Sequence, residues 1–359
     1  MKCLGKMVSG IGAVAVAALV VSGAPAKADS VADFYKGKVL TILLGHPPGG
    51  SYDLYAQLGA MHIGKYIPGN PNVVVEHRPG GGGGLAANYF FGKAPTDGSM
   101  IALLPETLAQ LQLMEPKRSR WDMAKIKYIG RFADVNSAYG VRSDAPATTI
   151  EGMKTTQVNV GCSGRASTGT QLPLIAKNLA GMKWNLVCGY KGSGPFMLAL
   201  ERGEVDMLVL NWATWRAKLM DQIKAGKYKI IAQSGLERTE ELKDVPLIQE
   251  LIGDEKVGAV HRFLAGGAPV GRALFGAPGM PDERIAALRT AFDKMVMDPA
   301  FIADANKRVA LLSPKSGAQV DKYSQAILNA PKEVVALAQQ GLTGYQANCP
   351  ADSCARKKK

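Results

Sequence analysis

Short apolar runs recur along the chain and alternate with segments of helical periodicity. The runs lie at residues 39–44, 73–75, 101–104, 158–161, 186–188, 205–210 and 229–232. Polar and apolar positions do not alternate within them, so both faces of each predicted strand should be buried, as in parallel sheets. Between the first two runs, Leu54, Leu58 and Met61 share one face of a helix predicted to begin near Ser51 and to end before Pro68.

A second helix is predicted after Pro281, because proline suits the first turn of a helix and acidic residues follow it. Its apolar stripe consists of Ile285, Leu288, Phe292 and Met295. The alternation of strands and helices predicts an α/β fold with right-handed crossovers.

The amino-terminal residues have the pattern of a secretory signal peptide. Lys2 and Lys6 precede an apolar stretch at residues 11–21, and Ala26-Lys27-Ala28 offers a small-residue cleavage site. The apolar stretch is shorter than the about 20 residues that a spanning helix needs. We therefore expect residues 1–28 to be a cleaved signal peptide of an exported protein.

The length predicts two domains. Without residues 1–28, 331 of the 359 residues remain, more than the about 100–200 residues of one typical domain. We expect the chain to cross to the second domain within residues 139–146 and to return within 260–275. The predicted division is domain 1 at 29–140 and 262–348, domain 2 at 141–261, and a basic tail at 349–359.

The charge pattern favours an anionic small molecule over nucleic acid. The formal net charge is +13, and it falls to +10 without Lys2, Lys6 and Lys27. Four of the remaining positive charges lie in the tail at residues 356–359, so the body is only mildly basic. No basic helix with interleaved aromatic residues suggests nucleic-acid binding.

Four cysteines remain after residue 28, an even number that permits disulfides in an exported protein. Cys349 and Cys354 are close enough in sequence to close a small loop. Cys162 and Cys188 both follow short apolar runs, so they either bridge neighbouring strands or stay as two buried thiols.

Two glycine-rich turns follow predicted strands at short separation. GHPPGGSYD spans residues 45–53 and RPGGGGGLAAN spans 78–88. Ligands of open α/β sheets bind beyond the carboxyl ends of the strands, where free N–H groups of helix N-termini favour anions. The motif GxxxxGK[ST] is absent and no complete dinucleotide motif follows, so the turns favour a carboxylate pocket over a phosphate site, with tight turns as the structural alternative.

The second half repeats this pattern. VGCSGRASTGT at residues 160–170 and GYKGSG at 189–194 each follow a predicted strand and are rich in glycines and hydroxyls. Two domains that each offer such turns can clamp a small anion between them.

Six motifs, taken in order, resemble one protein family. They are GHPPGGSYDLYAQ, VVVEHRPGGGGGLAANYF, APTDGSMIALL, VGCSGRASTG, GYKGSGPFMLALERGEVDMLV and FGAPGMPDERIAALRTAF. They are similar to motifs of the Bug-type periplasmic receptors of tripartite tricarboxylate transporters, and the resemblance covers about residues 33–345. It implies a two-domain, type II-like periplasmic-binding-protein fold, with mixed, mostly parallel sheets flanked by helices and a ligand cleft between the domains.

The resemblance also implies a function. Such a receptor captures a small organic anion in the periplasm, here a di- or tricarboxylate or a related carboxylate, and delivers it to membrane permease subunits. It holds the carboxylate with loop N–H groups, hydroxyls and ordered water. We expect no enzyme activity, no cofactor and no metal, and we expect the protein to be a monomer. A receptor that reports to a membrane sensor kinase needs the same clamp and stays an open alternative.

The predicted ligand-binding residues match family positions or lie beside the loops. They are Gly49, Gly50, Ser51, Asp53, Gly80, Gly82, Glu106, Ser163, Arg165, Ser167, Thr168, Tyr190, Gly192, Ser193, Asn211 and Trp212. Glu106, Arg165, Asn211 and Trp212 depart from the family pattern, so the ligand's identity cannot be transferred. The planar fork of Arg165 suits a carboxylate, whereas Glu106 would repel an anion unless the ligand carries an amine or hydroxyls.

A secreted hydrolase is the remote alternative. Ser163 lies in an incomplete GxSxG pattern, and no histidine is paired with it locally. Of the four histidines only His46 lies in a proposed cleft loop, where it either contacts ligand or packs. A metal site formed by His46, His62 and His77 lacks compact ligand spacing.

Overall fold

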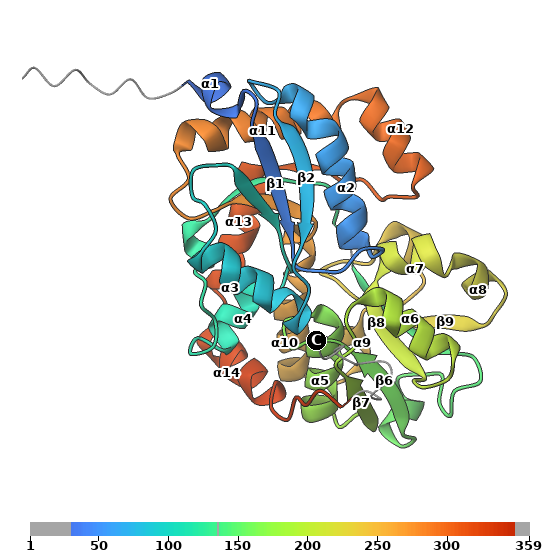
Figure 1. Ribbon diagram of the computed structural model, residues 1–359. Helices are drawn as coiled ribbons and strands as arrows, with labels where there is room; N and C mark the ends of the chain where they lie inside the picture. Colours follow the sequence, from blue (N-terminus) through green and yellow to red (C-terminus); the bar gives the residue numbers. More distant parts are fainter. Residues whose placement is uncertain (1–29, 135, 349–359) are drawn as a thin grey trace, which may run out of the picture.

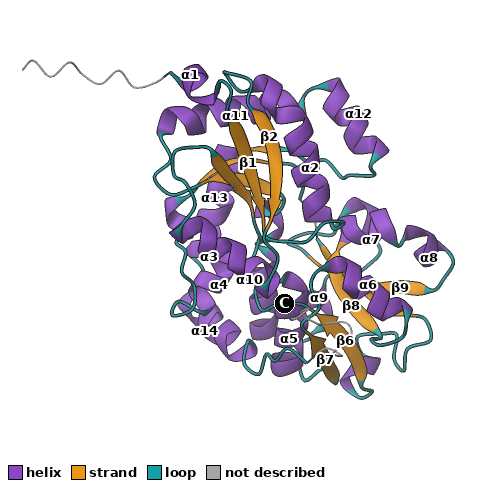
Figure 2. Cartoon of the chain, in the orientation of Figure 1, coloured by secondary structure: helices purple, strands orange, loops and turns teal. Residues whose placement is uncertain are grey.

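The computed structural model describes residues 30–134 and 136–348 and shows two α/β units, one above the other in Figure 1. The predicted signal peptide, Cys349, Cys354 and the basic tail lie outside the described residues. Helices cover both sheets in Figure 2. No helix within the described ranges is long and apolar enough to cross a membrane.

The first sheet has six strands in the order β11-β4-β10-β3-β1-β2. Their bounds are β1 (Val39–Leu44), β2 (Asn72–His77), β3 (Met100–Leu103), β4 (Lys127–Arg131), β10 (Ala273–Gly276) and β11 (Lys315–Ser316). Strand β1 pairs in parallel with β2 and β3, whereas β10 and β11 add antiparallel pairings.

The second sheet has five strands in the order β7-β6-β8-β5-β9. Their bounds are β5 (Ser137–Arg142), β6 (Val158–Cys162), β7 (Trp184–Cys188), β8 (Met207–Asn211) and β9 (Tyr228–Ser234). Strand β6 is parallel to β7 and β8, and β5 is antiparallel to β8 and β9.

The helices connect and cover these strands. The α-helices are α1 (Val31–Tyr35), α2 (Ser51–Ile63), α3 (Gly84–Gly92), α4 (Leu108–Met114), α5 (Thr168–Ala180), α6 (Ser193–Glu201), α7 (Trp212–Lys218), α8 (Met220–Lys224), α9 (Ile248–Leu251), α10 (Glu255–Ala265), α11 (Asp282–Val296), α12 (Pro299–Lys307), α13 (Gly317–Leu328) and α14 (Lys332–Gly341). Short 3-10 helices are η1 (Gly64–Tyr66), η2 (Gly81–Gly83), η3 (Met123–Lys125), η4 (Gly152–Lys154), η5 (Glu240–Leu242) and η6 (Ala268–Val270).

The α/β two-sheet architecture predicted from the sequence is confirmed. All seven apolar runs overlap strands, and the helices predicted at Ser51 and Pro281 are α2 and α11, with Pro281 as the N-cap. The sheets are mixed as predicted, but the expectation that they are mostly parallel is wrong: among the described residues four strand pairings are parallel and five are antiparallel. The apolar runs did not include β4, β5, β10 and β11, which make the antiparallel pairings.

The first passage between the sheets lies earlier than predicted. Strand β5 begins at Ser137 and already pairs within the second sheet, so the chain leaves the first sheet between Arg131 and Ser137 and not within 139–146. The chain rejoins the first sheet at β10, which starts at Ala273. The exact domain boundaries stay a prediction.

Apolar packing is continuous between the two units. One buried cluster contains Leu43 and Phe90 of the first unit together with Val160 of the second. The cluster on the other face joins Ile42 to Leu208. Helix α14 packs against α4, α5 and α10, so the carboxyl-terminal helix also bridges the units. The two sheets are therefore held in one closed arrangement.

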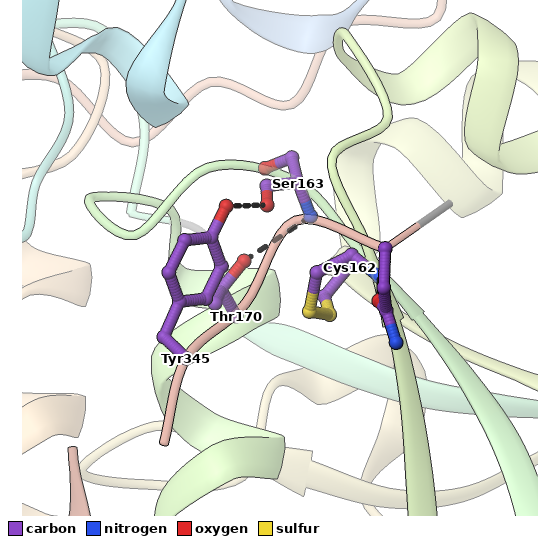
Figure 3. The surroundings of a disulfide bond; sticks show 6 residues. Cys162, Ser163, Thr170 and Tyr345 are labelled. Atoms are coloured by element: carbon purple, nitrogen blue, oxygen red, sulfur yellow. Dashed lines mark hydrogen bonds between the residues drawn. A yellow bond between two sulfur atoms is a disulfide. The ribbon is translucent and has the colours of Figure 1, made fainter. Parts of the chain in front are cut away.

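A disulfide joins Cys162 and Cys188, which pair in register at the ends of β6 and β7. Figure 3 shows it beside Ser163, whose carbonyl accepts from the Tyr345 hydroxyl at 2.8 Å. Asn348 lies next to the same strand end, because its Oδ1 accepts from Cys188 N at 2.8 Å. The bridge therefore fixes two adjacent strand ends directly before two glycine-rich loops.

Loss of this disulfide should destabilise the protein. The bridge spans a sequence separation of 26 residues, and constraining a loop of that length in the unfolded chain is worth about 3 kcal/mol. The double variant Cys162→Ala/Cys188→Ala should show that loss in urea denaturation. A reductant should lower the stability of the wild type by a similar amount, and any effect on the double variant would belong to the other cysteines. Equal stability of both proteins without reductant would contradict the prediction.

His261 on α10 gives the fold an acid-sensitive point. Its side chain is fully buried and neither ring nitrogen has a hydrogen-bond partner. Burial lowers its pKa from the usual 6.5 to about 4. Below about pH 6.5 the unfolded chain therefore binds a proton at His261 that the folded protein does not bind. The free energy of unfolding consequently decreases as the pH falls from about 6.5 towards 4.

Replacement of His261 by leucine should remove part of this sensitivity. Between pH 7 and pH 5 the wild type should lose about 2 kcal/mol through this one group, an order-of-magnitude figure from the size of the shift. Urea denaturation of wild type and His261→Leu at both pH values measures the difference. The idea fails if both proteins lose the same stability.

Candidate functional site

A small cavity lies between the two units, beyond the carboxyl ends of β1, β3, β6 and β8. Its volume is about 70 Å³, room for on the order of five water molecules. The first unit contributes His46, Pro47, Gly50, Ser51, Tyr52, Pro105 and Glu106. The second contributes Ser137, Ser163, Ser167, Thr168, Gly169, Gly192, Ser193, Phe196, Val209, Leu210, Asn211 and Thr214.

Three α-helices of nine or more residues begin at this cavity, beside the short helix α7, whose N-cap is Asn211. Helices α2, α5 and α6 have Gly50, Ser167 and Gly192 as N-caps, and none of these caps makes a side-chain hydrogen bond to its helix. Helices away from the cavity are of both kinds, since Asp254 and Asp298 cap α10 and α12, whereas α11 and α14 also lack a side-chain cap. The first-turn N–H groups of an α-helix lack partners within the helix, so those of α2, α5 and α6 can serve an anion.

Serine and threonine hydroxyls supply most of the remaining polar lining. Ser51, Ser163, Ser167, Thr168 and Ser193 all border the cavity. Among the described residues that line it, Glu106 is the one with a charged side chain. The cavity therefore offers an anion neutral donors and helix ends, and no lysine or arginine projects from its lining.

Glu106 is a buried carboxylate with several donors. Its Oε1 accepts from Thr168 Oγ1 at 2.6 Å, across the boundary between the units. Its Oε2 accepts from the Tyr52 hydroxyl and from Arg272 Nη1, the latter at 3.4 Å. The side chain of Glu106 is 8% exposed and that of Arg272 is fully buried. A buried charge of this kind needs such a partner to be tolerated.

Arg272 connects the Glu106–Arg272 pair to residues of both units. Its Nη2 donates to Ser51 Oγ at 2.9 Å and to Asn211 Oδ1 at the end of β8. Its guanidinium lies 4.1 Å from the centre of the Tyr52 ring, a cation–π contact. Burial lowers the pKa of Arg272, and the charge of Glu106 opposes that shift. The guanidinium is thus a structural cation that is already engaged on several sides.

His46 covers the other face of the Tyr52 region. The two rings stack with centroids 4.2 Å apart. Burial lowers the pKa of His46 to about 4, with Glu106 raising it and Arg272 lowering it further. The imidazole is therefore neutral at pH 7, and its Nδ1 is buried without a hydrogen-bond partner.

The units touch around the cavity. Ala166 N donates to Gly81 O at 3.2 Å, and Thr107 Oγ1 donates to Ala166 O at 2.5 Å. A Cβ added at Gly50 would lie 2.7 Å from Ser193 Oγ, so these two loops are in contact. The two units are consequently in contact around the cavity, which is bordered by loops of both.

Nine of the sixteen residues predicted as ligand-binding line the cavity. They are Gly50, Ser51, Glu106, Ser163, Ser167, Thr168, Gly192, Ser193 and Asn211. The sequence separates the first and last of them by 161 positions, so the fold brings both glycine-rich halves together as expected.

Arg165 does not line the cavity. Its Nε donates to both oxygens of Glu115 at 2.7 Å, and its Nη2 donates to Leu342 O. The hydroxyl-rich loop directs this side chain outward, because an acidic partner of the first unit lies there. The hypothesis that Arg165 grips a ligand carboxylate has no support in this geometry.

The glycines and acid flanking the first loops have structural roles. Gly49 N donates to Asp53 Oδ2 at 2.9 Å, and Asp53 also contacts His77 at 2.8 Å. Gly82 adopts a left-handed φ of 72° against the backbone of Ser167. Gly80, also at positive φ, packs against the Leu85 side chain.

Tyr190 and Trp212 are buried outside the cavity. The Tyr190 hydroxyl contacts Glu204 at 3.3 Å, and its ring meets Phe196 edge to face. Trp212 Nε1 donates to Glu241 Oε2 at 2.6 Å. Both aromatic side chains support the walls of the second unit.

Sequence reasoning missed Arg272 and Tyr52. Neither belongs to the quoted carboxylate loops as a recognised ligand, and Arg272 stands 166 positions from Glu106. The signal available was Glu106 itself, since a carboxylate directly after a buried strand requires a cation from elsewhere. Within the described residues no group of three His, Cys, Asp or Glu side chains is arranged to hold a metal.

Comparison with known proteins identifies a family to which this chain is similar. A family model for the tripartite tricarboxylate transporter family receptor matches residues 66–337. A relative from Cupriavidus necator, the "UPF0065 protein in gbd 5'region", is 30% identical over 246 residues, which is 67% of this chain and 71% of the relative.

Two solved structures have a similar fold. The periplasmic binding protein BugD superposes with a TM-score of 0.66 at 20% identity, covering 86% of this chain and 99% of BugD. MatC from Rhodopseudomonas palustris, solved with bound malate, gives a TM-score of 0.65 at 20% identity, covering 83% of this chain and 99% of MatC. At these identities the two structures support the fold alone.

The resemblance read from six motifs is thus confirmed, and the fold is that of substrate-binding proteins. Since the family model spans more than half of the sequence, this chain belongs to the receptor family of the tripartite tricarboxylate transporters.

Proposed function

We propose that this protein is an exported periplasmic receptor that captures a small organic carboxylate and delivers it to the permease subunits of a tripartite tricarboxylate transporter. The observation that carries the proposal is the convergence of the N-termini of α2, α5 and α6, which have no side-chain caps, on one cavity between the units. Malate in a neighbour of the same fold supports the ligand class. The family implies export, and the signal-like residues 1–28 agree with it.

Neutral donors suit a ligand that must be bound and then released. A carboxylate accepts several hydrogen bonds, and N–H groups at a helix N-terminus favour its negative charge. Hydroxyls such as Ser51 and Ser193 orient it from opposite units. The site thus recognises an anion without an arginine of its own for the ligand.

Closure distinguishes the ligand-bound receptor from the ligand-free receptor. Ligand contacts from both units stabilise the closed arrangement relative to an open one, because they exist only when the loops meet. The partner in the membrane would then recognise the closed surface. Loops that touch directly, such as those of Gly50 and Ser193, limit the size of a ligand that still permits closure.

The first prediction is a ligand class. In a thermal-shift screen, carboxylates should raise the melting temperature in a dose-dependent way, and neutral sugars should not. A ligand at 100 times its Kd stabilises by about 2.7 kcal/mol, which amounts to several degrees. Aliphatic, hydroxylated and aromatic acids belong in the screen. If only sugars stabilise the protein, the carboxylate assignment is wrong.

The second prediction concerns the first loop. A valine at Gly50 would push against Ser193 Oγ and keep the two units apart. The Kd of Gly50→Val for the best ligand of the screen should rise at least about tenfold, or ~1.4 kcal/mol, while the ligand-free protein stays folded. Gly194→Ala is the matched control, because its added Cβ meets no atom within 4 Å. Isothermal titration calorimetry that finds equal affinities would remove Gly50 from the closing contact.

A further inference from the structure

Glu106 lies at a helix N-terminus, a position that attracts anionic ligands. Its Oε1 accepts from the hydroxyl of Thr168, the first residue of α5, at 2.6 Å. That helix end belongs to the second unit, whereas Glu106 follows β3 of the first. The protein therefore places one of its own carboxylates against one of the helix N-termini that border the cavity.

The cation that balances Glu106 is buried behind the cavity lining, and its Nε has no hydrogen-bond partner. Arg272 is fully buried and donates to Glu106, Ser51 and Asn211 while its guanidinium lies on Tyr52. It is not part of the cavity lining. Glu106 and Arg272 together carry no net charge, so the lining holds no surplus positive charge for a second ligand carboxylate.

Glu106 keeps one acceptor position for a ligand. A carboxylate has about four acceptor positions, and three are used on Glu106, by Thr168, Tyr52 and Arg272. A donor group on the ligand can satisfy the remaining position, whereas a second carboxylate cannot.

We propose that Glu106 acts as a built-in carboxylate and selects a ligand with one carboxylate and a hydrogen-bond donor, an ammonium or a hydroxyl group, in place of a second carboxylate. The inference rests on the proposed function, since it assumes that an organic acid fills this cavity. The ligand carboxylate meets the N-termini of α2 and α6, where Ser51 and Ser193 lie. Its donor group faces Glu106.

The test compares ligands that differ in one group. On the carbon skeleton that gives the largest shift in the thermal-shift screen, four acids are titrated by calorimetry: the simple monocarboxylate, its ω-hydroxy and ω-amino forms, and the dicarboxylate of equal length. The wild type should bind the better of the hydroxy and amino acids at least about tenfold more tightly than the dicarboxylate. Glu106→Gln keeps the shape and removes the charge, and it should reduce that preference at least about tenfold.

Glu115→Gln is the matched control. Glu115 also pairs with an arginine between the units, Arg165, but lies outside the cavity lining. The ligand ranking of Glu115→Gln should equal that of the wild type.

The outcomes separate the two proposals. If the dicarboxylate binds wild type most tightly, or if Glu106→Gln leaves the ranking unchanged, the role of Glu106 is overturned while carboxylate binding stands. If no acid binds the wild type, the proposed function itself fails. Should Glu106→Gln not fold, the wild-type ranking alone decides the inference.

Discussion

The buried ion pair between Glu106 and Arg272 lies at the centre of the polar contacts that join the two units at the cavity. Removing one partner of a buried pair leaves an uncompensated charge, which typically costs ~3–5 kcal/mol. Here the pair also recruits Ser51 at the start of α2 and Asn211 at the end of β8. One network therefore connects a helix start, two strand ends and the segment that returns to the first sheet. Its burial fixes the distance between the walls of the cavity.

Around this pair the cavity offers an anion donor groups that carry no formal charge. Free arginines in the lining would attract carboxylates of any shape, and their desolvation would have to be offset on every closure. Helix N-termini act only over about one turn, so their attraction is local and depends on position. The small enclosed volume then converts local attraction into selectivity. A site of this kind distinguishes ligands by the position of each oxygen and donor.

Short-range sequence patterns predicted the parts of this site that are themselves short-range. The apolar runs, the glycine turns and the hydroxyl loops each lie within a few residues, and they border the cavity at Gly50, Ser167 and Gly192. Contacts between side chains far apart in the sequence could not be predicted from these patterns. Arg165 was predicted to bind the ligand because it lies inside a hydroxyl-rich loop, but in the structure it forms an ion pair with Glu115. The cation near the site is Arg272, which no periodicity or motif connects to Glu106.

The second wall is made rigid before any ligand arrives. The Cys162–Cys188 disulfide fixes the ends of β6 and β7, and Tyr345 holds the Ser163 carbonyl from the carboxyl-terminal segment (Figure 3). A wall that is already ordered loses little conformational entropy on binding, so more of the contact energy appears as affinity. The same rigidity prevents the loops from adapting to a poor ligand. A preformed second wall and an internal carboxylate in the first thus act together, since the charge of Glu106 discriminates between ligands only where the opposing loop cannot move away.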